Sequence, residues 1–226
     1  MSQPHLMPAI CKKHILAHRG FWSARSEMNT EAAFRKALEN GFGIETDIRD
    51  LDGKIVISHD PPISGQHQTL VFEDFVNICG EYDPTLPIAL NVKSDGLQRS
   101  LQQSIGKSSL NNFVLFDMSI PDLVQAYNAD LPFLTRCSEL EKSFELVAFA
   151  KGIWVDELTQ PWLNDNAWHD LAQYGKALYF VSPELHNRDH IARWADLFAW
   201  QARSRISIYL CTDFPDSAAQ FFWGIE

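Results

Sequence analysis

Two acidic residues, Glu45 and Asp47, have the spacing of a chemical site. They are separated by one residue, so a β-strand would present both carboxylates on the same side. Two like charges on one face repel each other unless a cation lies between them. The pattern therefore indicates either an oxygen-ligand site for Mg2+ or Ca2+, or a carboxylate pair bridged to Arg19, Arg49 or Lys93.

Asn91 and Lys93 repeat this spacing later in the chain. The amide oxygen of Asn91 is able to bind a hard cation, and the Lys93 ammonium is able to meet a phosphate oxygen. Taken alone, the pair is also typical of an ordinary strand-end turn. Its interpretation as a third metal ligand and a phosphate-binding cation depends on the carboxylate pair.

His18 and His59 each follow a short apolar run, which predicts an imidazole at the end of a strand. Imidazole titrates near neutral pH, so the two side chains are able to act as general base and general acid. Zinc ligation is the lesser alternative, because the neighbouring groups offer oxygen. His186 lies in a loop that should open on the same face. The other histidines are expected to be surface or structural: His5, His14, His67, His169 and His190.

The elements that must position these residues alternate between short apolar runs and amphipathic stretches. The predicted strands are His14–His18, Gly43–Ile48, Lys54–Ser58, Ile88–Val92, Phe113–Phe116, Phe133–Thr135, Gly152–Val155, Ala177–Val181 and Ser207–Cys211. The predicted helices are Thr30–Glu39, Glu73–Cys79, Gly96–Ile105, Ile120–Ala126, Glu139–Phe149, Pro161–Gln173, Arg188–Arg203 and Asp216–Trp223. Most strands lack strict polar alternation, which is typical of parallel strands buried on both faces.

Roughly eight strand–helix units within 226 residues favour an α/β fold of one domain, a (β/α)8 TIM barrel. An open doubly wound sheet is disfavoured, since the chain has no GxGxxG or Walker sequence. In a barrel the carboxyl ends of the strands converge on the face where active sites are built. The predicted site residues all lie at or just past such ends: His18, Arg19, Glu45, Asp47, His59, Asn91 and Lys93.

Composition narrows the class of protein. A formal net charge of -10 argues against a nucleic-acid partner, although acidic residues in a cleft would attract a divalent cation. The four cysteines form no zinc pattern and are expected to be free or buried thiols. No stretch reaches the length of a membrane span and residues 1–13 lack a signal-peptide core, so integral membrane association is not expected and a cytoplasmic location is.

Several of these residues, taken in order, resemble the glycerophosphodiester phosphodiesterase family, whose barrel is of the phospholipase C-like type. The match begins at His18-Arg19-Gly20 and continues through residues 29–34, 43–47 and 52–60. Phe116-Asp117-Met118-Ser119 and residues 212–216 look like the family's later strand ends, so the similarity covers about residues 14–220 of a single domain, 1–226.

The resemblance implies a role for each matching residue: a divalent metal held by Glu45 and Asp47, a phosphate contacted by Arg19 and Lys93, and acid–base catalysis by His18 and His59. The implied activity is hydrolysis of a glycerophosphodiester to glycerol phosphate and an alcohol, a reaction of lipid metabolism. In the family the substrate's own neighbouring hydroxyl can attack, giving a cyclic phosphate that water then opens.

Three departures separate this chain from the family pattern. Asn91-Val92-Lys93 replaces a Glu-x-Lys strand, Met28 replaces a carboxylate before Asn29-Thr30, and residues 178–182 match a late Trp-Thr-Val-Asn strand poorly. Two further interpretations therefore stay open. One keeps the chemistry on a phosphodiester from a polysaccharide or lipid headgroup, and the other is a barrel that binds phosphorylated ligands without turnover.

Overall fold

The structure, a computed structural model, describes residues 10–65, 69–108, 110–203 and 206–224, so His5 and His67 lie outside the described residues. Its strands are β1 (Ile15–His18), β2 (Gly43–Leu51), β3 (Lys54–Ile57), β4 (Ile88–Val92), β5 (Phe113–Phe116), β6 (Leu134–Cys137), β7 (Gly152–Val155), β8 (Ala177–Val181) and β9 (Ile208–Thr212). Its α-helices are α1 (Glu31–Glu39), α2 (Phe72–Gly80), α3 (Gln98–Ile105), α4 (Ile120–Asn128), α5 (Asp165–Ala172), α6 (Ile191–Arg203) and α7 (Pro215–Trp223).

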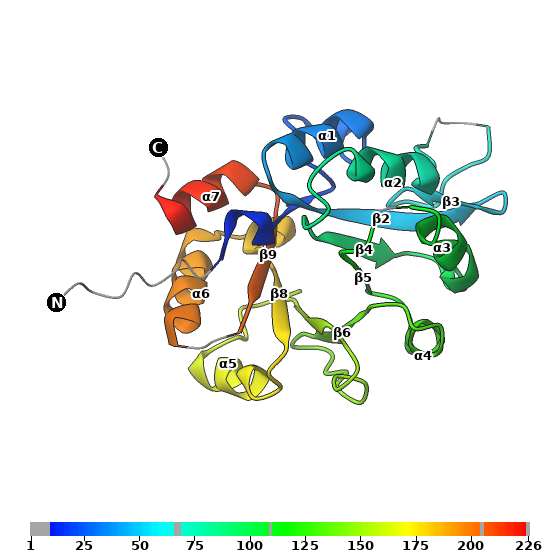
Figure 1. The fold of residues 1–226 in the computed structure, drawn as a ribbon. Coiled ribbons are helices and arrows are strands. Elements are labelled where there is room, and N and C mark those ends of the chain that lie inside the picture. The colour runs from blue at the N-terminus through cyan, green and yellow to red at the C-terminus, as the bar shows by residue number, and fades with distance from the viewer. Residues whose placement is uncertain (1–9, 66–68, 109, 204–205, 225–226) are drawn as a thin grey trace.

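Eight strands form a parallel sheet in the order β5-β4-β2-β1-β9-β8-β7-β6. A single parallel bridge between Leu115 and Phe133 links its two edge strands, so the sheet nearly closes into a barrel. The helices surround the strands, as Figure 1 shows. The predicted (β/α)8 TIM barrel is confirmed.

The strand β3 differs from the prediction, because it is not a barrel strand. It pairs antiparallel with β2, with Leu51 opposite Lys54. The turn between them is Asp52-Gly53, and both residues have positive φ, 50° and 78°. Two such residues make the tight turn whose twist suits a β-hairpin. His59 therefore follows a strand that returns toward the barrel rather than one that leaves it.

The predicted helix Glu139–Phe149 is wrong. The chain instead folds back on β6 through an antiparallel bridge between Cys137 and Lys142. The Ser138 hydroxyl accepts hydrogen bonds from two following backbone N–H groups, and the Glu139 carboxylate accepts two more from residues 158 and 159. Such local bonds give the backbone an alternative to a helix.

Side-chain caps explain several helix boundaries. The Thr30 hydroxyl accepts a hydrogen bond from the Ala33 N–H, so α1 begins at Glu31 and Thr30 itself is outside the helix. The Asn164 side chain accepts from residues 166 and 167, which starts α5 at Asp165, later than the predicted Pro161. The remaining predicted elements are found with ends shifted by at most three residues.

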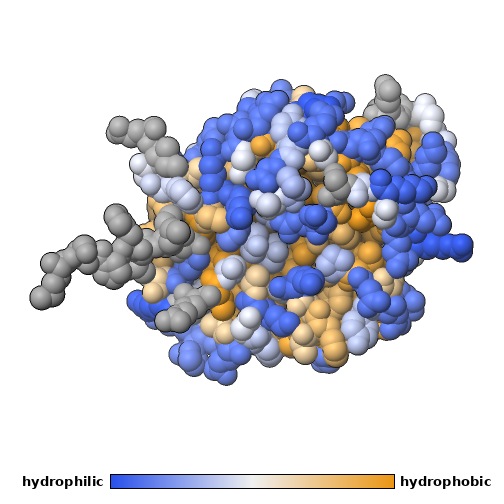
Figure 2. Space-filling view, in the orientation of Figure 1, coloured by the Kyte–Doolittle hydropathy of each residue, from blue (hydrophilic) through white to orange (hydrophobic). Residues whose placement is uncertain are grey.

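Apolar side chains form two buried clusters. The larger packs the helices against the outside of the barrel, with Phe34, Phe72, Phe75 and Trp194 among its fully buried members. The smaller lies between barrel strands and includes Phe116 stacked on Trp154 at 3.8 Å between ring centroids. Figure 2 shows mostly hydrophilic residues over the upper part and the right side of the face it presents, with apolar residues gathered below the middle.

The structure also describes the state of the four cysteines and the length of the helices. Cys11, Cys79, Cys137 and Cys211 are all free, and the last three are buried. Within the described part of the chain, no helix is both long and apolar enough to cross a membrane.

Candidate active site

His18 is the last residue of β1, and a residue at the end of the neighbouring strand β9 positions its side chain. Its Nδ1 lies 2.6 Å from Oδ1 of Asp213, which follows β9. The Asp213 backbone N–H in turn donates to the Glu184 carboxylate at 3.1 Å, and the Thr212 hydroxyl donates to the same carboxylate. A carboxylate bonded to Nδ1 leaves Nε2 as the imidazole nitrogen available to accept a proton.

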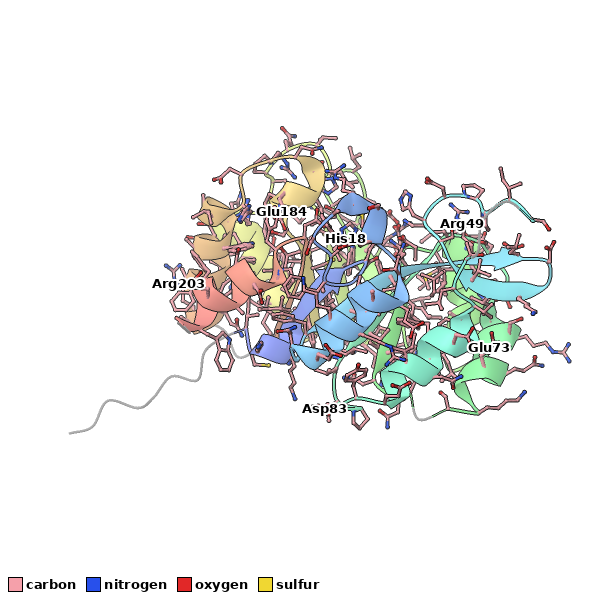
Figure 3. The ribbon with its side chains drawn as sticks, turned by 90° about the horizontal axis from the view of Figure 1, so that it is seen from above. His18, Arg49, Glu73, Asp83, Glu184 and Arg203 are labelled. Atoms are coloured by element: carbon pink, nitrogen blue, oxygen red, sulfur yellow. The ribbon has the colours of Figure 1, made fainter. Side chains whose placement is uncertain are left out.

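The labelled side chains of Figure 3 locate this face of the barrel. His18, Arg49 and Glu184 lie in the upper half of this view, and Asp83, which precedes β4, lies at the lower edge. The site therefore lies at the carboxyl ends of the barrel strands, where the sequence predicts it.

The loop after β1 explains why Arg19 and Gly20 follow His18. Both residues have positive φ, 57° and 87°. A Cβ added to Gly20 would lie 2.8 Å from the Ala33 backbone, so only glycine lets the loop pass this close to α1. The Arg19 N–H donates to the Glu45 carbonyl oxygen at 2.8 Å, which fixes the arginine above β2.

The carboxylate pair on β2 is buried, with Glu45 2% and Asp47 1% exposed. Asp47 Oδ2 lies 3.0 Å from Arg19 Nε and accepts a hydrogen bond from the Asn29 side chain, also at 3.0 Å. Lys93 Nζ lies 3.8 Å from Asp47 Oδ1. Two of the three cations expected to pair with these carboxylates, Arg19 and Lys93, therefore contact Asp47.

Glu45 is compensated less well than Asp47. Its nearest ionisable partner is His18, whose Nε2 lies 3.8 Å from Glu45 Oε2. Burial raises the pKa of Glu45 from 4.5 to about 7, and the Asp47 charge adds to the rise, while His18, Arg19 and Lys93 oppose it. Glu45 is thus the member of the pair that most needs another positive charge.

Three side-chain oxygens on β2 and β4 fit a hard cation. Glu45 Oε2, Asp47 Oδ1 and Asn91 Oδ1 are all buried without a hydrogen-bond partner. They lie on adjacent strands, and the register places Asp47 opposite Asn91. A buried polar atom without a partner is costly, and oxygen donors of this kind suit Mg2+ or Ca2+. Among the described residues no group of three His, Cys, Asp or Glu is arranged for a metal, so such a site depends on the neutral Asn91.

His59 is more exposed to solvent than His18. Its side chain is 46% exposed, and its Nδ1 lies 2.8 Å from Oδ1 of the neighbouring Asp60. Arg49 does not pair with the carboxylates but donates to the backbone carbonyls of His59 and Lys93. This bridge ties the β3 hairpin to the end of β4.

A cavity of about 270 Å³ opens between the strand ends. One wall, from β1, β2 and β4, presents His18, Arg19, Glu45, Asn91 and Lys93. His59 is not among the residues that line this cavity, whereas the singled-out His186 is. Its Nε2 lies 2.7 Å from Asp156 Oδ1, and this hydrogen bond raises the pKa of His186.

Some residues of the site were not predicted as such from the sequence. Asp213 and Asn29 fell within recognised motifs but were not given roles at the site, and Asp156 and Arg136 carried no local signal. Each lies on a strand end or loop whose partner is distant in the sequence. Only the order of the strands around the barrel brings such residues together.

Asp213 should act as a positioning residue for His18. We expect Asp213→Asn to lower kcat by about 10-fold or more with KM nearly unchanged, because an amide does not hold the imidazole tautomer as a carboxylate does. Steady-state kinetics on a phosphodiester would check this, with Asp213→Glu expected to recover part of the lost kcat. A fall in kcat/KM caused by KM alone would contradict the positioning role.

Comparison with known proteins finds one matching family and several solved structures with a similar fold. Residues 18–70 match the Glycerophosphoryl diester phosphodiesterase family, which confirms the predicted resemblance over the segment that contains His18, Arg19, Glu45, Asp47 and His59. No curated protein matches the chain.

Three solved structures share the fold over most of the chain. A candidate glycerophosphodiester phosphodiesterase from Galdieria sulphuraria has a TM-score of 0.72 at 16% identity, covering 92% of this chain and 96% of its own. The glycerophosphodiester phosphodiesterase from Agrobacterium tumefaciens str. C58 has a TM-score of 0.63 at 18% identity, covering 92% and 97%. A Ca2+-dependent phosphatidylinositol-specific phospholipase C from Streptomyces antibioticus has a TM-score of 0.53 at 12% identity, covering 92% and 95%.

Proposed function

We propose that this chain is a divergent member of the glycerophosphoryl diester phosphodiesterase family that hydrolyses a small phosphodiester, a glycerophosphodiester in particular. The observation that carries the proposal is that an imidazole oriented by a carboxylate, His18 with Asp213, lines the same cavity as Arg19 and Lys93. An oriented base beside two cations suits attack on a phosphate ester, where negative charge must be neutralised as the bond to phosphorus forms.

The proposed chemistry assigns a role to each group. Nε2 of His18 removes the proton of the attacking hydroxyl, from water or from the substrate itself. Arg19 and Lys93 neutralise charge on the phosphoryl oxygens. The bond between phosphorus and the leaving alcohol breaks, and His59 gives a proton to the departing oxygen. Because His59 does not line the cavity, this role requires the substrate to extend from the cavity to the β3 hairpin.

Glu45, Asp47 and Asn91 are proposed to hold a divalent ion, Mg2+ or Ca2+. The three buried oxygens without a hydrogen-bond partner support this, as does the low charge compensation of Glu45. When bound, such an ion supplies Lewis-acid stabilisation of phosphoryl charge. The remaining work of binding and proton transfer belongs to the side chains already named.

A screen of glycerophosphodiesters with Mg2+, Ca2+ and Mn2+ tests the proposal. We expect metal-stimulated release of glycerol phosphate. A barrel that binds phosphorylated ligands without turnover is the second candidate, favoured by the placement of His59 outside the cavity and by the pairing of Arg19 with Asp47. Binding of phosphate esters with no product from any diester would support this second candidate.

Asn91 offers a direct check on the metal ligands. We expect Asn91→Glu to bind the metal more tightly, because a carboxylate attracts a hard cation more strongly than an amide oxygen does. Turnover at saturating metal should be unchanged or lower, since the added charge also repels the phosphate. Isothermal titration would measure the affinity, with Asn111→Glu, the same change at an exposed position, as control. Equal or weaker affinity in the Asn91 variant would mean that Asn91 is not a ligand.

A further inference from the structure

Four large apolar side chains on α6 and α7 are exposed, and the proposed chemistry uses none of them. They are Ile191, Phe198, Phe214 and Phe221, each between 38% and 49% exposed. Ile191 and Phe198 are seven residues apart on α6, and Phe214, the N-cap of α7, is seven residues before Phe221. Seven residues make about two helical turns, so each pair lies on one side of its helix. Together the four side chains define the α6–α7 face.

The two pairs lie along the same seam between the helices. α6, drawn in orange, and α7, drawn in red, are neighbours in both ribbon views (Figures 1 and 3). The Phe221 ring lies 5.5 Å from the ring of Trp194, which is buried on α6. The Phe198 ring lies 6.5 Å from the ring of Phe222, which is buried on α7. Each exposed ring therefore contacts the other helix, and the two helices present a shared surface.

One end of the α6–α7 face adjoins the active site. The Phe214 ring lies 5.4 Å from the ring of His190, the residue before Ile191, so one ring links the two exposed side chains at this end. Phe214 also follows Asp213, the residue that holds His18. The face therefore begins beside the active site and continues along both helices.

The α6–α7 face has the size of an interaction surface. An aromatic side chain presents about 150–250 Å², so the exposed fractions of the three rings and Ile191 leave about 300–400 Å² of apolar surface. Exposed patches of this size are often functional. Because a protein interface is about 60% apolar, a partner would cover about 600 Å² of this chain, or about 1,200 Å² counted on both sides. That area is the lower end of the range for specific interfaces.

The charges of α6 and α7 indicate which partner the face fits. The two helices carry two charges of each sign: Arg193, Arg203, Asp196 and Asp216. Arg193 and Asp196 form an ion pair at 2.9 Å. The whole chain has a net charge of -10, so two copies repel each other over most of their surfaces but not at this balanced one. Helices that bind lipid surfaces carry an excess of Lys and Arg, which α6 and α7 lack.

Small residues between the rings give a further reason for a second copy. Ala195 and Ala199 are exposed on α6 on either side of Phe198. Alanines leave grooves into which the large side chains of another helix pack, whereas a lipid surface has no side chains that match such grooves. We propose that the α6–α7 face is the interface through which two copies of this chain form an isologous dimer. This inference goes beyond the proposed function and does not depend on it.

Sedimentation velocity of the full chain, from nanomolar to high-micromolar concentration, tests the dimer. We expect the wild-type protein to reach twice the mass of the chain, with a Kd of about 1 μM or below, because specific interfaces of about this area reach such affinities. Its Tm should also rise with protein concentration, because association stabilises the folded state by mass action.

Substitutions on the face should weaken the dimer without unfolding the chain. Phe198→Glu is expected to raise the Kd by about 100-fold or more, because two-fold symmetry places the new charge in the interface twice. Ala195→Arg changes an exposed alanine, leaves the core intact and should have a similar effect. Phe149→Glu, the same change at an exposed ring between β6 and β7, is the control and should dimerise as the wild type does. Thermal melts at the lowest concentration, where every protein is monomeric, would show that the variants are folded.

Three outcomes would overturn the interface. The first is a wild-type protein that stays monomeric at every concentration. The second is a dimer whose Kd is unchanged in Phe198→Glu and Ala195→Arg, since the copies would then meet on another surface. The third is a monomer that co-sediments with phosphatidylcholine vesicles and loses this binding in Phe198→Glu, which would assign the face to a lipid surface.

Discussion

His18→Ala is expected to lower kcat for a phosphodiester by about 10²-fold or more without unfolding the protein, the scale of lost acid–base catalysis. The side chain is held by Asp213 at 2.6 Å and lies 3.8 Å from Glu45, so its position in the cavity is defined on two sides. Its side chain lines the cavity and belongs to neither apolar cluster, so its loss removes no packing from the core. Steady-state kinetics and a thermal melt of the same preparation would separate catalysis from folding.

A loss of the same size is expected for His59→Ala if His59 protonates the leaving alcohol. His169→Ala, which removes an exposed histidine on α5, is the matched control and should keep full activity. A variant with near-normal turnover of the identified substrate would remove that histidine from the mechanism. The structure makes this comparison informative, because His18 lines the cavity and His59 does not.

Local patterns are sufficient to predict the barrel and the cluster of Glu45, Asp47 and Asn91. The two-residue spacing of Glu45 and Asp47 requires only a strand, and the register places Asn91 beside them on the neighbouring strand. The β2–β3 hairpin could also have been predicted, because Asp52-Gly53 is a typical hairpin turn. The apolar run Lys54–Ser58 after this turn instead resembles a barrel strand when it is considered alone.

Other features depend on contacts between distant segments. The pairing of His18 with Asp213 joins residues separated by 195 positions, and the pair of Asp156 and His186 spans 30. No local spacing encodes such pairs. The helix prediction for the segment after β6 is wrong for a related reason. The Glu139 carboxylate accepts hydrogen bonds from the backbone beyond β7, and these bonds hold the segment in turns. Long-range bonds of this kind override local helix preference.

Removal of the metal is the second change with a large expected effect. If Glu45, Asp47 and Asn91 hold a divalent ion, EDTA should lower turnover by about 10³-fold, since metal Lewis acidity is worth several kcal/mol in a charged transition state. The folded protein should also lose stability, because the unfolded chain has no formed site. Metal at a hundred times its Kd stabilises by about 2.7 kcal/mol, which corresponds to roughly 5 to 10 °C in Tm for a chain of this length.

The size of the Tm shift should depend on pH through Glu45. Its pKa in the folded protein is raised to about 7 from 4.5, so between these values the metal-free folded state binds more protons than the unfolded state. The stability of the metal-free protein therefore falls as pH rises through this window. A metal replaces that proton, so the stabilisation by Mg2+ or Ca2+ should be larger at pH 8 than at pH 5.5.

Thermal melts at both pH values, with EDTA and with each metal, provide the measurement. Glu45→Gln and Asp47→Asn should abolish the metal-dependent shift, and Asp170→Asn, an exposed control on α5, should keep it. Glu45→Gln should in addition remove most of the fall in metal-free stability with rising pH, because the buried charge that forms above pH 7 is gone. An unchanged Tm at pH 8 with every metal, combined with full activity in EDTA, would leave Arg19 and Lys93 as the cations that compensate the pair and exclude the ion from the mechanism.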